Sequence, residues 1–72
     1  MSLKKGELVS FDAGSYTATV KLLGSDKAYL DGVSVARNIA SSEMTAGRKV
    51  GVVFFDESNA REAVIIAVYT QG

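Results

Sequence analysis

The chain has 72 residues, a formal net charge of +0 from 8 Lys+Arg and 8 Asp+Glu, and no Cys, His, Pro or Trp. A chain of this length forms one domain, over residues 1–72. The absence of Cys excludes disulfides and thiolate metal sites, and the absence of His removes the usual general base near neutral pH. We therefore expect a binding, structural or assembly module rather than an enzyme, with no catalytic, metal-binding or cofactor-binding residues.

No targeting or membrane segment is visible. The apolar runs are far shorter than the roughly 18 residues that a transmembrane helix needs. The start of the chain, Met1 to Gly6, lacks the apolar stretch of a signal peptide. We expect no membrane insertion, and no secretion through a visible signal peptide.

The apolar content is high for so short a chain, since hydrophobic residues make up 47% of it. A domain near this size buries only about 60% of the surface that its unfolded chain exposes. Small domains also need an additional source of stability, and disulfides are excluded here. We therefore expect the chain to associate with itself.

Alternation of apolar and polar residues predicts three strands in the first half of the chain: Glu7 to Asp12, Tyr16 to Leu23, and about Ala28 to Ala36. The second has the clearest pattern, with one apolar face made by Tyr16, Ala18, Val20 and Leu22. Turn residues separate the three strands and predict a meander. Asp31-Gly32 interrupts the third strand and indicates a bulge or bend, since a hairpin there would have very short arms.

The segment from Arg37 to Gly47 has no strand periodicity. Ser41 or Ser42 can cap a short helical turn that runs through Ala46, and Gly47 suits a left-handed helix end.

Two further strands, Lys49 to Phe55 and Ala63 to Tyr69, are apolar almost throughout. Strands that are apolar on both faces need cover on both faces, and the chain is too short to supply it. These strands are therefore the predicted subunit interface. The candidate interface residues are Val53, Phe55, Ile65 and Tyr69. Of Phe54 and Phe55, whichever points inward belongs to the core, and the other is a candidate anchor for a partner.

Five strands with a helical turn between the third and the fourth predict an all-β, OB-like barrel, with an SH3-like barrel as the alternative.

The segment from Gly47 to Asp56, followed by a polar loop and Ala63 to Tyr69, resembles the OB domain of phage baseplate-hub and tail-spike proteins and of the related type VI secretion spikes. The segment departs from that pattern at Arg48, at Ala67 and in its lack of proline. The resemblance implies a non-enzymatic virion or tail component with other virion proteins as neighbours, and a trimer is common in that family. The expected location is accordingly a virion or the cytoplasm.

An alternative hypothesis is an OB or SH3-like module that binds single-stranded nucleic acid. Its candidate residues are Lys21, Lys27, Tyr29 and Arg37, since aromatic side chains beside basic ones stack on bases. The balanced charge and the lack of a basic run argue against it.

The segment from Asp56 to Asn59 has the highest density of side-chain oxygens. It could in principle hold a hard cation, but it lacks the EF-hand spacing, and a solvated loop is the simpler interpretation.

Overall fold

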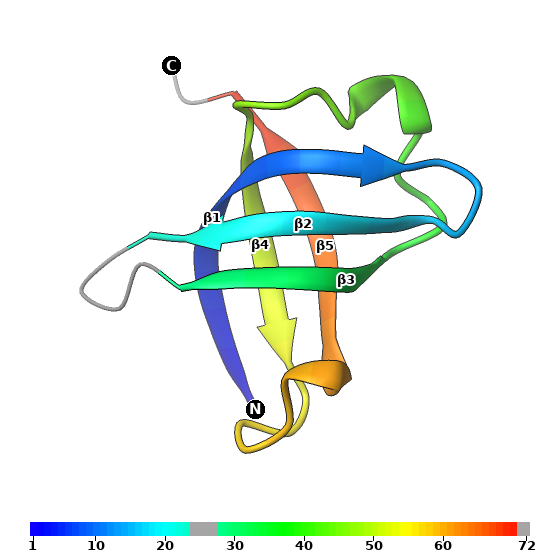
Figure 1. Ribbon diagram of the computed structural model, residues 1–72. Helices are drawn as coiled ribbons and strands as arrows, with labels where there is room; N and C mark the ends of the chain where they lie inside the picture. The colour runs from blue at the N-terminus through cyan, green and yellow to red at the C-terminus, as the bar shows by residue number, and fades with distance from the viewer. Residues whose placement is uncertain (24–27, 71–72) are drawn as a thin grey trace.

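The computed structural model describes residues 1–23 and 28–70, which form a closed five-stranded β-barrel (Figure 1). The strands are β1 (Ser2–Asp12), β2 (Thr17–Leu22), β3 (Tyr29–Val35), β4 (Lys49–Phe54) and β5 (Ala63–Tyr69). They pair in the order β1–β2–β3–β5–β4, and β4 closes the barrel onto β1. A 3₁₀ turn, η1 (Ser41–Glu43), lies between β3 and β4. The all-β, OB-like barrel predicted from the sequence is thereby confirmed.

The strand β1 belongs to both layers of the barrel. Its residues from Gly6 onward pair with β2, while Ser2 to Glu7 pair with β4. Figure 1 shows this strand bending from the layer of β2 and β3 into the layer of β4 and β5. Gly6 lies at the bend and is buried, and a Cβ there would lie 3.2 Å from the carbonyl oxygen of Lys21 and 3.4 Å from a methyl group of Val50. Only glycine fits this crossing without displacing a neighbour.

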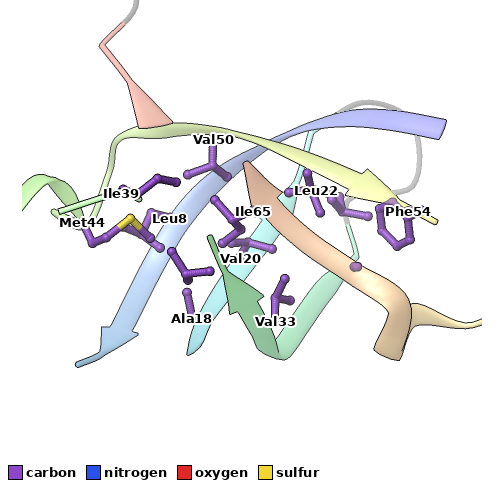
Figure 2. Close-up of a cluster of buried hydrophobic side chains, with 13 residues drawn as sticks. Leu8, Ala18, Val20, Leu22, Val33, Ile39, Met44, Val50, Phe54 and Ile65 are labelled. Atoms are coloured by element: carbon purple, nitrogen blue, oxygen red, sulfur yellow. The ribbon is translucent and has the colours of Figure 1, made fainter. Parts of the chain in front are cut away.

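The core fills the barrel from end to end. Its most deeply buried large side chains are Leu8, Val20, Val50, Val52 and Ile65. Figure 2 shows Ile39 and Met44, from the β3–β4 connection, at one end of this cluster and Leu22 and Phe54 at the other. The connection therefore closes one end of the barrel with apolar side chains.

Three bulges interrupt the alternation. The register shifts at Val9 in β1, at Asp31-Gly32 in β3 and at Ile66 in β5, and each shift inserts one extra residue. Gly32 has φ +65°, and Thr19 on the opposite strand donates a hydrogen bond to Asp31 over 3.1 Å. Of the two possibilities that the sequence left open for Asp31-Gly32, the structure shows a bulge.

Several boundaries differ from the prediction. The strand β1 starts at Ser2 rather than Glu7, because its backbone pairs with β4 although Lys4 and Lys5 carry no apolar pattern. The residue before η1 is Ala40, which makes no side-chain cap, so the predicted serine cap is wrong. Gly47 does have a positive φ, +95°, but it lies in a tight turn between Thr45 and Arg48 instead of ending a helix. The turn η2 (Ala60–Glu62), which leads into β5, was not predicted.

We expect Gly6→Ala to lower the free energy of unfolding by about 1–3 kcal/mol, the usual cost of overpacking. The new methyl group would meet backbone and core atoms that cannot move independently. Urea unfolding at low protein concentration measures the change. Gly51→Ala is the matched control, because a Cβ there meets its nearest neighbour, the Ala67 methyl, at an ordinary 3.7 Å. Equal stability of the two variants would contradict the close crossing at Gly6.

Candidate functional site

An apolar surface covers the outside of the layer formed by β1, β4 and β5. Leu3 pairs with Val53 and Val53 pairs with Val64, so these side chains form one row across three strands. Phe55 and Ile66 extend the row, because each follows an outward-facing residue by two positions. We call these five residues, Leu3, Val53, Phe55, Val64 and Ile66, the apolar face.

The exposure of the apolar face is concentrated on its outer members. Phe55 is 57% exposed and Ile66 is 46% exposed, and Leu3 is also exposed. Val53 is only 8% exposed, because its partners Leu3 and Val64 flank it on the outer surface. It does not belong to the core cluster inside the barrel. The bulge in β5 makes both Ile66 and Ala67 point outward, so Val68 can return to the core side.

Of the four interface residues predicted from the sequence, Phe55 and Tyr69 are exposed, whereas Val53 and Ile65 are buried. Phe55 is exposed while Phe54 is buried in the core, which settles which phenylalanine points inward. Tyr69 is exposed at the far end of β5, opposite Lys49. Ile65 is a correction, because it is completely buried inside the barrel, where no partner can contact it.

The two ends of the apolar face carry opposite charge. At the end beyond Phe55 lie three carboxylates, those of Asp56, Glu57 and Glu62, and two cations, the Arg61 guanidinium and the N-terminal ammonium. The ammonium forms an ion pair with Glu57 over 3.0 Å. At the other end lie Lys5 and Lys49 on neighbouring strands, with Lys49 3.8 Å from Glu7. The surface therefore has an acidic-rich end and a basic-rich end with apolar side chains between them.

The candidate nucleic-acid residues are only partly brought together. Lys21 and Tyr29 are direct partners across β2 and β3 and lie side by side on the outer surface. Glu7 is the partner of Lys21 on its other side, so a carboxylate adjoins the basic residue. Lys27 lies outside the described residues.

Arg37 belongs to a different part of the barrel. Its guanidinium lies 5.0 Å from the centre of the Tyr16 ring, a cation–π distance. The same ring packs edge-on against Phe11, and its hydroxyl donates a hydrogen bond to the carbonyl of Ile39. Because β3 runs away from Tyr29 toward this cluster, Arg37 does not extend the Lys21–Tyr29 pair.

The oxygen-rich loop after β4 is organised by its own side chains. Asp56 accepts hydrogen bonds from the hydroxyl of Ser58 over 2.8 Å and from its backbone N–H over 3.0 Å. These two bonds, the hydroxyl first, lower the pKa of the Asp56 carboxyl below its ordinary value. Within residues 1–23 and 28–70, no three carboxylates gather closely enough to hold a metal ion.

Sequence reasoning missed three members of the apolar face. Leu3 was placed outside any strand, because the basic residues after it hide the pairing with β4. Val64 and Ile66 were placed on the fifth strand but not singled out, because a continuous apolar run does not show which of its residues face outward. Strand alternation alone would have directed Ile66 outward and Ala67 inward.

No helix within the described part of the chain is long and apolar enough to cross a membrane. Comparison with protein-family models, with curated proteins and with solved structures gives no match for this chain.

Ser58→Ala should raise the pKa of Asp56 part of the way to its ordinary value, since the hydroxyl is the larger cause of its lowering. The hydrogen bonds favour the ionised carboxylate, so their stabilising effect is present at neutral pH and is lost as the pH falls through the native pKa. Carboxyl ¹³C NMR titration of both proteins measures the shift, and Ser42→Ala, at an exposed serine of η1, serves as the control. Identical Asp56 titrations in all three proteins would refute this account of the loop.

Proposed function

We propose that this chain is a non-enzymatic assembly module that associates with itself through the apolar face. The observation that carries the proposal is the exposure of Phe55, Ile66 and Leu3 on one side of a closed barrel. These side chains add nothing to the core, and contiguous exposed apolar residues with a charged rim are typical of protein–protein contacts.

A second copy of the chain is the partner that fits this surface. The net charge of +0 means that copies do not repel one another. In a contact with two-fold symmetry and antiparallel strands, the acidic-rich end of one copy lies over the basic-rich end of the other. The Lys5 and Lys49 end of each copy then meets Asp56, Glu57 and Glu62 of its partner.

The size of the apolar face indicates a contact of moderate strength. Burying an exposed phenylalanine, leucine or isoleucine side chain is worth about 1.5–3 kcal/mol. A two-fold contact buries each such side chain once in each copy. Association itself costs about 4–15 kcal/mol, so we expect dissociation in the micromolar range.

The resemblance of the segment from Gly47 to Tyr69 to the OB domain of phage hub and spike proteins supplies a context for this activity. We propose that the chain is a structural component of a phage or phage-like tail or baseplate. Its neighbours would then include other virion proteins, and its contribution would be its shape and its contact surfaces.

The decisive experiment is light scattering after size exclusion, over a series of concentrations from low to high micromolar. The wild-type protein should change from monomer to oligomer across this series. Ile66→Asp should weaken association by about 100-fold, because each copy would lose an apolar contact and place a carboxylate in the interface.

Val9→Asp is the matched control. Val9 is 42% exposed, close to the 46% of Ile66, and also lies at a strand bulge, but it is not part of the apolar face. Its association should equal that of the wild type, and circular dichroism should show all three proteins folded. A wild-type chain that remains monomeric at high micromolar concentration would refute self-association. Equal weakening by both variants would refute the assignment to this face.

A further inference from the structure

The strand β3 has a free edge over most of its length. On the side away from β2, only Ser34 and Val35 are paired, with Val64 and Ile65 of β5. Within residues 1–23 and 28–70, no strand and no other backbone group bonds to Tyr29–Val33 on that side. Each unpaired N–H and C=O on such an edge can bond to another extended chain.

The hydrogen-bond pattern shows where the free groups lie. Leu22 donates its N–H to the carbonyl of Ala28 over 2.7 Å, and Lys21 is the register partner of Tyr29. In an antiparallel pair, this pattern makes Lys21 and Tyr29 a non-hydrogen-bonded pair. The N–H and C=O of Tyr29 therefore point away from β2. Because the direction of the backbone groups alternates along a strand, the N–H and C=O of Asp31 also point away from β2.

A depression of about 390 Å³ adjoins this edge, lined by Leu30, Asp31, Gly32 and Arg61. Leu30 supplies a half-buried apolar surface. The Arg61 side chain, on η2, is exposed and forms no hydrogen bond or ion pair with the described residues. Asp31, by contrast, already accepts the hydrogen bond from Thr19. The depression therefore presents an unpaired guanidinium beside free backbone groups.

We propose that the free edge of β3 binds a short extended peptide that carries a carboxylate. The peptide adds as a strand beside Tyr29 and Asp31, places an apolar side chain against Leu30, and bonds through its carboxylate to the Arg61 guanidinium. Strand addition supplies the backbone bonds, and the arginine selects an acidic side chain or a chain terminus. The site is independent of the proposed self-association, since it uses β3 and η2 rather than the apolar face.

The bulge at Asp31-Gly32 fixes the length of the bound segment. A bulge twists an edge and interrupts a regular ladder, which is a common protection against edge-to-edge aggregation. The regular part of the free edge extends only from Tyr29 to the bulge. This edge can therefore accept a short strand but offers a poor template for a long one or for a second copy of β3.

A labelled peptide of alternating valine and threonine that ends in glutamate is a suitable probe, and fluorescence anisotropy at low ionic strength follows its binding. We expect saturable binding, about tenfold weaker binding by Arg61→Ala, and a similar loss when glutamine with an amidated end replaces the terminal glutamate. Lys4→Ala removes an exposed cation that lies on β1 and should leave the affinity unchanged.

A second variant tests the backbone contact. Proline is tolerated on an edge strand where the N–H it removes faces solvent, so Tyr29→Pro should keep the barrel while it abolishes peptide binding. Amide hydrogen exchange at Tyr29 and Asp31 should slow when the probe binds. If circular dichroism shows that Tyr29→Pro is unfolded, the Arg61→Ala comparison and the amide-exchange measurement still test the proposal.

Three results would overturn the proposal. The first is an absence of saturable binding at low ionic strength. The second is unchanged affinity in Arg61→Ala together with unchanged amide exchange at Tyr29 and Asp31. The third is protection of these two amides that rises with protein concentration without any probe, which would assign the edge to a second copy of the chain.

Discussion

The barrel closes because one strand takes part in both of its layers. β1 bonds to β2 with its second half and to β4 with its first half, and the two sets of bonds overlap at Gly6 and Glu7. At this crossing β1 approaches the carbonyl of Lys21 and the side chain of Val50 so closely that a Cβ would have to displace a neighbour slightly. The missing side chain at Gly6 thus lets β1 pass from one layer to the other without displacing these neighbours.

Closure also determines how many apolar side chains remain outside. In a barrel strand alternate residues must face outward, and in β4 and β5 the outward residues include Val53, Val64 and Ile66. Val64 and Ile66 do not belong to the core cluster, so polar residues at these two positions would leave it as it is. Folding of the single chain therefore gives no reason for apolar residues at these two positions, and contact with a partner is the explanation that we propose.

The bulges also affect which side chains face the core and which face the outer surface of the barrel. The extra residue in β5 lets Ile65 and Val68 both contact the core while Ile66 and Ala67 both face outward. A regular strand would have turned one member of each pair to the wrong side. The exposure of Ala67, and not that of Ile66, is thus a consequence of the same irregularity that keeps the end of β5 attached to the core.

Sequence patterns predicted the parts of the fold in which side-chain alternation and backbone pairing coincide. The strand β2 shows regular alternation, and its buried residues are Ala18, Val20 and Leu22 as expected. The start of β1 could not be predicted, because Lys4 and Lys5 take part in pairing through backbone atoms that every residue has. Polarity likewise could not assign Ile65 to the core and Ile66 to the surface, since the two residues are identical and only the register distinguishes them.

The candidate site shows the same limit. The sequence identified the strands that carry the apolar face, because two nearly continuous apolar runs exceed what a small interior can hold. It did not identify the free edge of β3, because an edge is defined by which strand fails to pair beside it. β3 and β5 share only two residue pairs. This short pairing follows from the three-dimensional closure of the barrel rather than from any local sequence pattern.

The distribution of charge distinguishes between the symmetries that the apolar face could support. In a ring of copies related by an axis parallel to the strands, equivalent ends lie side by side, so the carboxylates of Asp56, Glu57 and Glu62 from different copies would approach one another. In an antiparallel two-fold contact the same carboxylates meet Lys5 and Lys49. If the chain associates as we propose, this arrangement of charges would favour a dimer over the trimer that is common in the phage spike family. Such a contact is closed, because each copy uses the same patch. The β3 edge and Arg61 lie on other elements, so a dimer of this kind would present two copies of the proposed peptide site without growing into a filament.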